Sequence, residues 1–225
     1  MHALAIALAA VLSLSQSIAG QTAPRANAEA VTLPKEIPLF PLPNVVLFPG
    51  VTRPLLIFEP RYREMVGDAL KGDRIIGTVL LQPGFEKDYE GRPPIHDIGC
   101  AGEIEEYEQL PDGRYVILLR GLTAFRVVSE DQRKPYRLAR VDAVPEILQD
   151  EERGALSATR ERLAQLLYTV LPLGVEPPDA SLDDAEFVNV TAQSLRMQEA
   201  DRQQLLERNS VLARARALVD RLQPK

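Results

Sequence analysis

Five of the six prolines in residues 37–66 constrain the fold of this chain more than any other feature of its sequence. They are Pro38, Pro41, Pro43, Pro49 and Pro54. Proline fixes φ and lacks a backbone N–H, so a sheet accepts it only at an edge, at a bulge or at the start of a strand. We therefore expect residues 39–40 and 45–48 to be short strands in edge or bulged positions, with turns at Asn44 and at Pro49-Gly50.

A short helix is predicted directly after the proline-rich segment, over residues 60–71. Glu59 and Pro60 open this helix, because the missing N–H of proline is harmless in the first turn. Lys71-Gly72 closes it. Its predicted apolar face comprises Tyr62, Met65, Val66, Ala69 and Leu70.

The next part of the chain reads as a series of strands bounded by turn residues. The predicted strands are residues 74–82, 97–108, 115–120, 123–129 and 136–144. The turn Pro111-Asp112-Gly113-Arg114 joins two of them as a hairpin. Five or six strands at this spacing indicate a small twisted sheet or an incomplete barrel, because closure protects strand edges from pairing with other chains.

From Pro145 onward the apolar residues recur at helical spacing. Three stripes are present: Leu156, Leu163, Leu166, Leu167, Val170 and Leu171; Ala185, Val188, Ala192 and Leu195; and Leu205, Leu212, Val219 and Leu222. Ser181 is the predicted N-cap of the second helix. Five arginines are expected on the solvated face of the last helix, namely Arg202, Arg208, Arg214, Arg216 and Arg221. Each apolar face must be buried, so we expect a helical bundle packed on itself and on the barrel.

The composition favours a globular protein and disfavours nucleic-acid binding. Hydrophobic residues make up 45% of the chain, which is enough to build a core. The formal net charge is −6, whereas affinity for nucleic acid rests on clustered lysine and arginine. Tryptophan is absent and other aromatic residues are sparse, so few side chains are available for stacking on bases.

The first residues have the character of an export signal. Residues 3–14 form an apolar run that is too short to span a bilayer, followed by small residues that offer cleavage after Ala19 or after Ala28. These features predict export to the periplasm or the exterior. The segment before the run contains no lysine or arginine, however, so the amino terminus alone supplies the positive charge expected there. The alternative is an uncleaved leader on a cytoplasmic protein.

Residues with catalytic or metal-binding chemistry are few. The sequence contains no G-x-x-x-x-G-K-[ST] phosphate loop, no G-x-S-x-G elbow and no H-E-x-x-H zinc helix. Cys100 alternates with apolar strand residues, which favours a buried thiol, and His96 lies in a proline-rich loop without an evident orienting partner. The acidic cluster of Glu103, Glu105, Glu106 and Glu108 is predicted to be a solvated strand end.

Two motifs carry a resemblance to a known family. The first is residues 37–66, with its prolines, short strands and helix start. The second is residues 98–128: a strand with an early glycine, an acidic strand end, the Pro-Asp-Gly-Arg turn, then Gly121 and a strand with Arg126. Pro135-Tyr136 introduces the next strand. The sequence over residues 35–223 resembles the N-terminal domain of Lon proteases, in a free-standing form that lacks the ATPase and protease domains.

This resemblance implies an α+β fold in which a PUA-like β pseudo-barrel with one short helix precedes a C-terminal helical bundle. The expected division is a leader at residues 1–34, a barrel subdomain at 35–145 and a helical subdomain at 146–225. The resemblance also implies a non-catalytic module that needs no cofactor and binds exposed segments of unfolded or partner proteins. The alternatives are a hydrolase or peptidase with an unrecognised site, and a PUA-like domain that binds RNA or a small ligand.

A binding surface is predicted in the loop of residues 83–94. Phe85 and Tyr89 lie there among polar residues, and loops on a rigid scaffold often carry aromatic anchors for partners. The opposite interpretation is that both rings fold back as a lid over the barrel core.

Overall fold

The computed structural model describes residues 31–85, 91–172, 174–208 and 210–223, and within them the chain forms one mixed sheet of six strands and five α-helices. The predicted α+β class is therefore confirmed. The elements in chain order are β1 (Glu36–Leu42), β2 (Thr52–Ile57), α1 (Pro60–Ala69), β3 (Ile75–Leu80), β4 (Ile98–Gln109), β5 (Tyr115–Asp131), β6 (Arg137–Val144), α2 (Arg153–Val170), α3 (Asp184–Ser194), α4 (Glu199–Leu206) and α5 (Val211–Leu222). Both predicted cleavage points, after Ala19 and after Ala28, lie outside the described residues.

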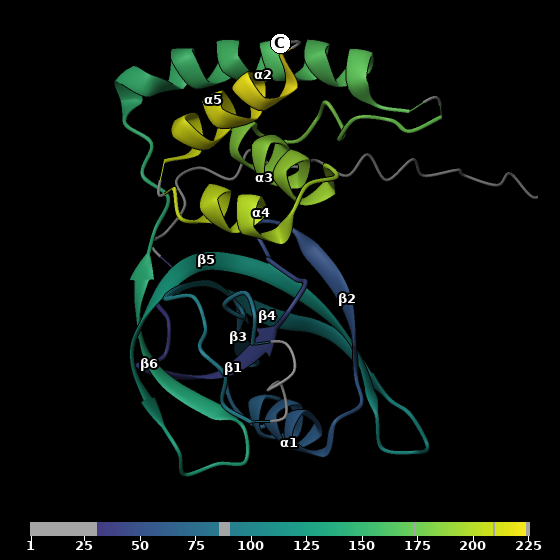
Figure 1. Cartoon of the computed structure of the whole chain (residues 1–225), viewed down its shortest axis with the longest axis vertical. Helices are drawn as coiled ribbons and strands as arrows, with labels where there is room; N and C mark the ends of the chain where they lie inside the picture. The colour runs from purple at the N-terminus through teal and green to yellow at the C-terminus, as the bar shows by residue number, and fades with distance from the viewer. Residues whose placement is uncertain (1–30, 86–90, 173, 209, 224–225) are drawn as a thin grey trace, which may run out of the picture.

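The sheet closes on itself and leaves one strand outside the closed part. Its strand order is β2-β5-β4-β3-β1-β6, and β6 also pairs with β5 (Figure 1). The β1–β3 pair is parallel and the other pairs are antiparallel. Among the described strands β2 pairs with β5 alone, so it lies at the edge of the sheet.

The long strand β5 replaces the two shorter strands predicted at residues 115–120 and 123–129. The prediction was wrong because Gly121 continues the strand through a register shift opposite Ala101 and Gly102 instead of making a turn. A Cβ atom at Gly121 would lie 2.1 Å from the carbonyl oxygen of Phe48. Glycine is therefore needed here for the close approach of two backbone segments.

The prolines of β1 do not lie at a sheet edge, which corrects the first expectation. Residues Glu36 to Leu39 of this strand pair with β6, and Leu39 to Leu42 pair with β3. Pro38 and Pro41 therefore each occupy a half of β1 with a pairing partner on one side, where a missing N–H is tolerated. The strand predicted at 45–48 is also wrong: these residues are buried in irregular backbone, and the edge strand is β2, which contains Pro54.

Helix α1 is confirmed where the sequence predicted it. Pro60 occupies its first turn, and Tyr62, Met65, Val66 and Ala69 are buried against the sheet. Figure 1 shows α1 at the end of the barrel that is farthest from the other helices.

Helices α2 to α5 form a layer over the opposite end of the barrel, with α2 outermost (Figure 1). The cap of α3 is Asp183, whose side chain accepts the N–H of Glu186, and not the predicted Ser181. The third predicted stripe divides into two helices, α4 and α5. The side chain of Ser210 accepts the N–H of Ala213 and begins α5, which is the start signal that the stripe alone did not reveal.

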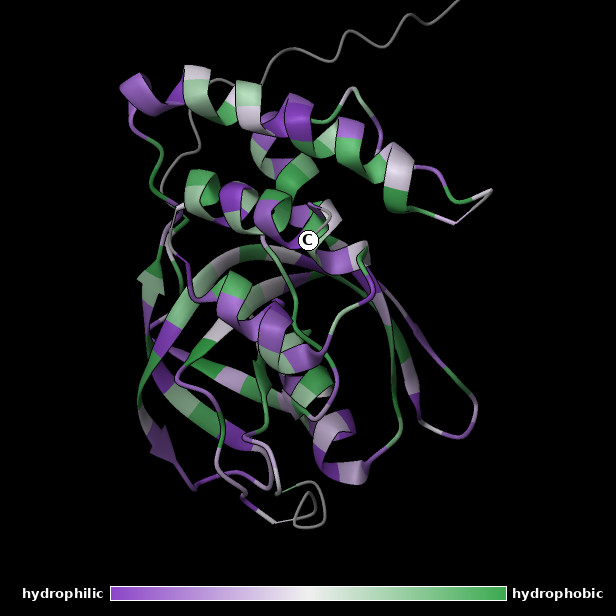
Figure 2. Cartoon of the chain, turned by 45° about the horizontal axis from the view of Figure 1, so that its top comes forward, coloured by the Kyte–Doolittle hydropathy of each residue, from purple (hydrophilic) through white to green (hydrophobic). Residues whose placement is uncertain are grey.

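The barrel and the helical layer share one hydrophobic core. Phe48 and Leu119 of the barrel belong to the same buried cluster as Phe187 and Leu212 of the helices. Hydrophobic and hydrophilic residues alternate along the helices, as Figure 2 shows, and all five helices contribute buried apolar residues to this cluster. Within the described residues, no helix is both long and apolar enough to cross a membrane.

Two of the five arginines predicted to be solvated are buried, which corrects that expectation. Arg214 is 0% exposed; its guanidinium donates to the carbonyls of Leu205 and Arg208 at 2.9 and 2.8 Å and pairs with Glu146. Arg202 is also buried and bonds to the backbone of α3 and its C-cap. Their charges are matched by hydrogen bonds, which permits burial. The three exposed members, as predicted, are Arg208, Arg216 and Arg221.

Candidate functional site

An apolar groove lies beside the edge strand β2, where β1 and α1 meet it. It encloses about 90 Å³. Its walls come from β1, β2, the segment after β2 and α1: Phe40, Leu42, Leu55, Leu56, Ile57, Phe58, Glu59 and Tyr62. Seven of these eight residues are apolar or aromatic, with Glu59 as the single charged wall. We call this cavity the apolar groove.

Two walls of the apolar groove are large side chains that remain in contact with solvent. Leu56 is 48% exposed and Phe58 is 60% exposed. Val116 of β5 lies directly opposite Leu56 in the sheet and is exposed as well. Clustered exposed apolar side chains commonly mark a surface that binds another molecule.

The floor of the apolar groove is rigid. The rings of Phe40 and Tyr62 meet with centroids 4.6 Å apart, and both side chains are buried. The guanidinium carbon of Arg61 lies 4.6 Å from the centroid of the Tyr62 ring, on the side of the next cavity. Aromatic contacts of this kind hold rings in fixed positions.

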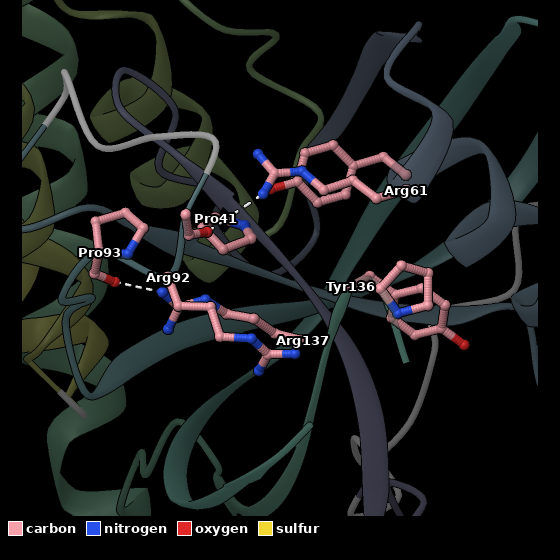
Figure 3. A pocket seen from close by; sticks show the side chains of 9 residues that line it. Pro41, Arg61, Arg92, Pro93, Tyr136 and Arg137 are labelled. Atoms are coloured by element: carbon pink, nitrogen blue, oxygen red, sulfur yellow. Dashed lines mark hydrogen bonds between the residues drawn. The ribbon is translucent and has the colours of Figure 1, made fainter. Parts of the chain in front are cut away.

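A second, smaller cavity borders the groove across Tyr62. Arg61 of α1, Arg92 of the loop before β4 and Arg137 of β6 all line it (Figure 3). The remaining walls are Pro41, Tyr62, Gly91, Pro93, Pro135 and Tyr136. We call it the arginine pocket.

The three arginines of this pocket differ in how their charge is balanced. Arg61 pairs with Glu59 at 2.9 Å, and Arg137 pairs with Glu130 at 2.9 Å while also donating to the Pro93 carbonyl. Arg92 donates to the backbone carbonyls of residues 131 and 134, at 3.3 and 3.2 Å. Within the part of the chain that the structure describes, its guanidinium forms no ion pair with a carboxylate.

The far wall of the pocket is fixed by a polar cluster around Asp68. Tyr136 donates its hydroxyl to Asp68 at 2.9 Å, and Lys134 donates to the same carboxylate at 2.8 Å. The hydrogen bond from Lys134, more than any other contact, lowers the pKa of Asp68. Burial, followed by the bond to Asp68, raises the pKa of Tyr136, so this hydroxyl stays protonated.

The loop predicted to bind a partner is placed only in part. Phe85 is 37% exposed, so its ring is in partial contact with solvent. Tyr89 lies outside the described residues. Gly91, Arg92 and Pro93 of the same loop form walls of the arginine pocket.

The residues predicted to take no part in catalysis or metal binding lie where they were expected, with one correction. Cys100 is buried in β4, and burial raises the pKa of its thiol. Glu103, Glu105, Glu106 and Glu108 are all exposed at the end of β4. His96, however, does have a partner, because its Nδ1 lies 3.3 Å from a carboxylate oxygen of Glu207. Within the described ranges, no group of three or more histidine, cysteine or acidic residues could hold a metal ion.

Sequence reasoning did not identify the apolar groove. The usable signal was the unbroken apolar run at residues 55–58, directly after Pro54. A strand that buries one face alternates apolar and polar residues, whereas this run places apolar side chains on both faces of β2.

The fold is shared with solved Lon N-terminal domains. The N-terminal domain of the Mycobacterium avium complex Lon protease matches with a TM-score of 0.64 and 18% identity, over 84% of this chain and 98% of that one. A Lon N-terminal domain protein from Xanthomonas campestris matches with a TM-score of 0.57 and 28% identity, over 82% of this chain and 97% of that one.

The family model for the ATP-dependent protease La (LON) substrate-binding domain matches residues 36–223. The chain therefore belongs to this family, as the two sequence motifs indicated. Lon protease 2 of Myxococcus xanthus is 28% identical over 202 residues, and the Lon protease of Anaeromyxobacter dehalogenans is 26% identical over 202 residues. The matched region covers 86% of this chain and 24% of each relative, so the chain spans about a quarter of their length. The family match concerns the substrate-binding domain and not the ATPase or protease domains.

Proposed function

We propose that this chain is a non-catalytic module that binds exposed apolar segments of unfolded or partner proteins in the apolar groove. The observation that carries this proposal is the pair Leu56 and Phe58, two large solvent-exposed side chains that line a groove with a rigid aromatic floor. Rigid apolar anchors around a small cavity are typical of interfaces in which a few side chains supply most of the binding energy.

The size of the groove favours a polypeptide over a small molecule. Pockets for drug-sized ligands and cofactors usually enclose about 300–1,000 Å³. The groove encloses about 90 Å³ and extends into exposed apolar surface, which suits one inserted side chain of a longer segment. We accordingly propose that no cofactor takes part.

The absence of catalysis is part of the proposal and has its own support. The thiol of Cys100 is buried, and His96 is paired with Glu207 instead of a nucleophile. Nucleophilic catalysis needs an accessible nucleophile within hydrogen-bond reach of its base. The net charge of −6 likewise favours a polypeptide partner over nucleic acid.

Three finer features belong to the same proposal. The barrel is of the PUA-like type, the chain divides into a barrel subdomain at residues 35–145 and a helical bundle at 146–225, and Phe85 and Tyr89 add contacts to the bound segment. The exposure of Phe85 and the position of its loop beside the arginine pocket support the last point.

We also propose that the protein is exported through its N-terminal leader. The apolar run at residues 3–14 and the small residues before each cleavage point support this proposal. N-terminal sequencing of the native mature protein tests it: a first residue of 20 or 29 is expected, and Met1 would contradict export by cleavage.

The binding proposal is tested with a permanently unfolded protein, reduced and carboxymethylated lactalbumin, titrated against the full chain. The double variant Leu56→Ser, Phe58→Ser is expected to weaken binding at least about ten-fold, because both side chains lose their apolar contacts. Both residues are already largely exposed, so the melting temperature should change little.

The matched control is Tyr168→Ser on α2. Tyr168 is 75% exposed and lies in the helical layer, away from the groove, so its loss should leave binding unchanged. If the control weakens binding as much as the double variant does, or if the unfolded protein does not bind at all, the groove is not the binding site.

A further inference from the structure

We propose that the apolar groove and the arginine pocket form one site, and that the bound segment carries an acidic side chain next to its apolar anchor. This inference rests on the proposed function and names the chemistry of its ligand. An extended segment that places an apolar side chain in the groove brings its neighbouring side chains toward the arginine pocket.

The two cavities share a wall. Tyr62 lines both of them, and the ion pair between Glu59 and Arg61 joins a wall of the groove to a wall of the pocket across 2.9 Å. An extended polypeptide advances about 3.3 Å per residue. Because the two cavities share the wall formed by Tyr62, one extended segment can reach both of them.

The charges at the pocket favour a negative guest. Three guanidinium groups line it; among the described residues, Glu59 pairs with Arg61 and Glu130 pairs with Arg137. The charge of Arg92 also acts on Asp131, whose carboxylate is paired with Arg133 at 2.8 Å. Arg92 adds a positive charge that only backbone carbonyls contact among the described residues. Because those two carbonyls hold the guanidinium in place, a carboxylate can bind it without first ordering the side chain.

Glu59, the acidic wall of the groove, opposes the binding of a negative side chain. Its carboxylate lies between the groove and the pocket and occupies two nitrogens of Arg61. A bound carboxylate would be repelled by Glu59 and attracted by Arg92. Neutralising these two residues should therefore change the preference for acidic segments in opposite directions.

The test uses two blocked twelve-residue peptides, with fluorescence anisotropy on the full chain. Both contain a central Leu-Val-Phe sequence, followed by Glu in one peptide and Gln in the other. The wild-type protein is expected to bind the Glu peptide about three- to five-fold more tightly, and high salt should reduce this ratio.

Three variants test which residues cause the preference for the Glu peptide over the Gln peptide. Arg92→Gln should bring the ratio close to one, whereas Glu59→Gln should increase it. Arg153→Gln, which removes the same charge from the exposed start of α2, should leave it unchanged. If Arg92→Gln does not fold, the comparison of the two peptides on the wild-type protein still decides the inference.

The outcomes separate this inference from the proposed function. Equal binding of both peptides, each weakened by the Leu56→Ser, Phe58→Ser variant, overturns the acidic preference and leaves the proposed function standing. Failure of both peptides to bind contradicts both. The bound carboxylate could also be the C-terminus of a polypeptide. A third peptide, which ends in a free carboxylate directly after the apolar residues, tests this source. Tighter binding than that of the Glu peptide would overturn the assignment to an acidic side chain.

Discussion

Replacing Arg214 by methionine is expected to destabilise the protein by about 3 kcal/mol. Arg214 is fully buried where α5 meets the barrel, and its guanidinium carbon lies 5.3 Å from the centroid of the Phe48 ring. Methionine is unbranched and flexible and fills part of the space of the arginine side chain. The main effect of the substitution is therefore the loss of charge and hydrogen bonds.

The magnitude follows from the acceptors that the substitution leaves behind. The carbonyls of Leu205 and Arg208 and the Oδ1 atom of Asn189 each lose a donor, and the loss of one such hydrogen bond costs about 1 kcal/mol. Glu146 loses its ion pair, but its side chain is 16% exposed, so water can partly replace the guanidinium. Breaking a fully buried pair costs about 3–5 kcal/mol, and access of water places this case at the lower end.

Urea unfolding followed by far-UV circular dichroism measures the change, and a fall in melting temperature of about 10 °C should accompany it. Arg216→Met, an exposed neighbour on the same helix, is the control and should change stability by less than about 0.5 kcal/mol. Adding Glu146→Gln to Arg214→Met should cost less than the sum of the two single changes, since no charge is left unpaired. A loss below about 1 kcal/mol for Arg214→Met would refute the reasoning.

Three further substitutions or treatments test other parts of the structure. Gly121→Ala should cost about 2–3 kcal/mol in urea unfolding, because its Cβ would lie 2.1 Å from the Phe48 carbonyl oxygen. Asp68 has a lowered pKa, chiefly through its bond from Lys134, so it stabilises the fold above its unfolded pKa of about 3.9 and loses that effect as pH falls through the lower folded value. Asp68→Asn should therefore flatten the loss of stability below about pH 4. The buried Cys100 thiol, whose pKa is raised by burial, should resist iodoacetamide in the folded protein and react fully in urea, as mass spectrometry can show.

Each of these three predictions has a result that would contradict it. A Gly121→Ala protein as stable as the wild type would mean that the two backbone segments are farther apart than the structure shows. An unchanged acid limb in Asp68→Asn would remove Lys134 and Tyr136 as the cause of the lowered pKa. Rapid alkylation of Cys100 without denaturant would contradict its burial in β4.

Strong local signals were sufficient for helix α1 and for the hairpin between β4 and β5. Pro60 at the first turn predicted α1, and the Pro-Asp-Gly-Arg turn predicted the hairpin between β4 and β5, where Gly113 has a φ of 81°. Errors arose where long-range pairing decides the outcome. No local pattern indicates that the two halves of β1 pair with different strands, which is what permits Pro38 and Pro41 inside the sheet.

The five arginines show that local spacing is also insufficient to predict burial in the helices. Charged residues at helical spacing usually form a solvated face, and three of the five arginines do so. Arg214 differs because Glu146, 68 residues away in the sequence, lies beside it in the fold. Such a partner cannot be inferred from spacing within one helix.

The candidate site was the least predictable part. The sequence directed attention to aromatic residues in a polar loop, and Phe85 is indeed exposed. The groove, however, arises where the edge of β2 meets β1 and Tyr62 of α1, so it exists only after the sheet has formed. The arginine pocket beside it similarly combines residues from α1, a loop and β6.

Hydrogen exchange of the full chain, with and without saturating unfolded lactalbumin, tests the central claim most directly. Binding in the apolar groove predicts slower exchange in the peptides that cover residues 54–62 and no change in those that cover α2. Slower exchange confined to the helical layer, or no change anywhere along the chain, would contradict the proposed site.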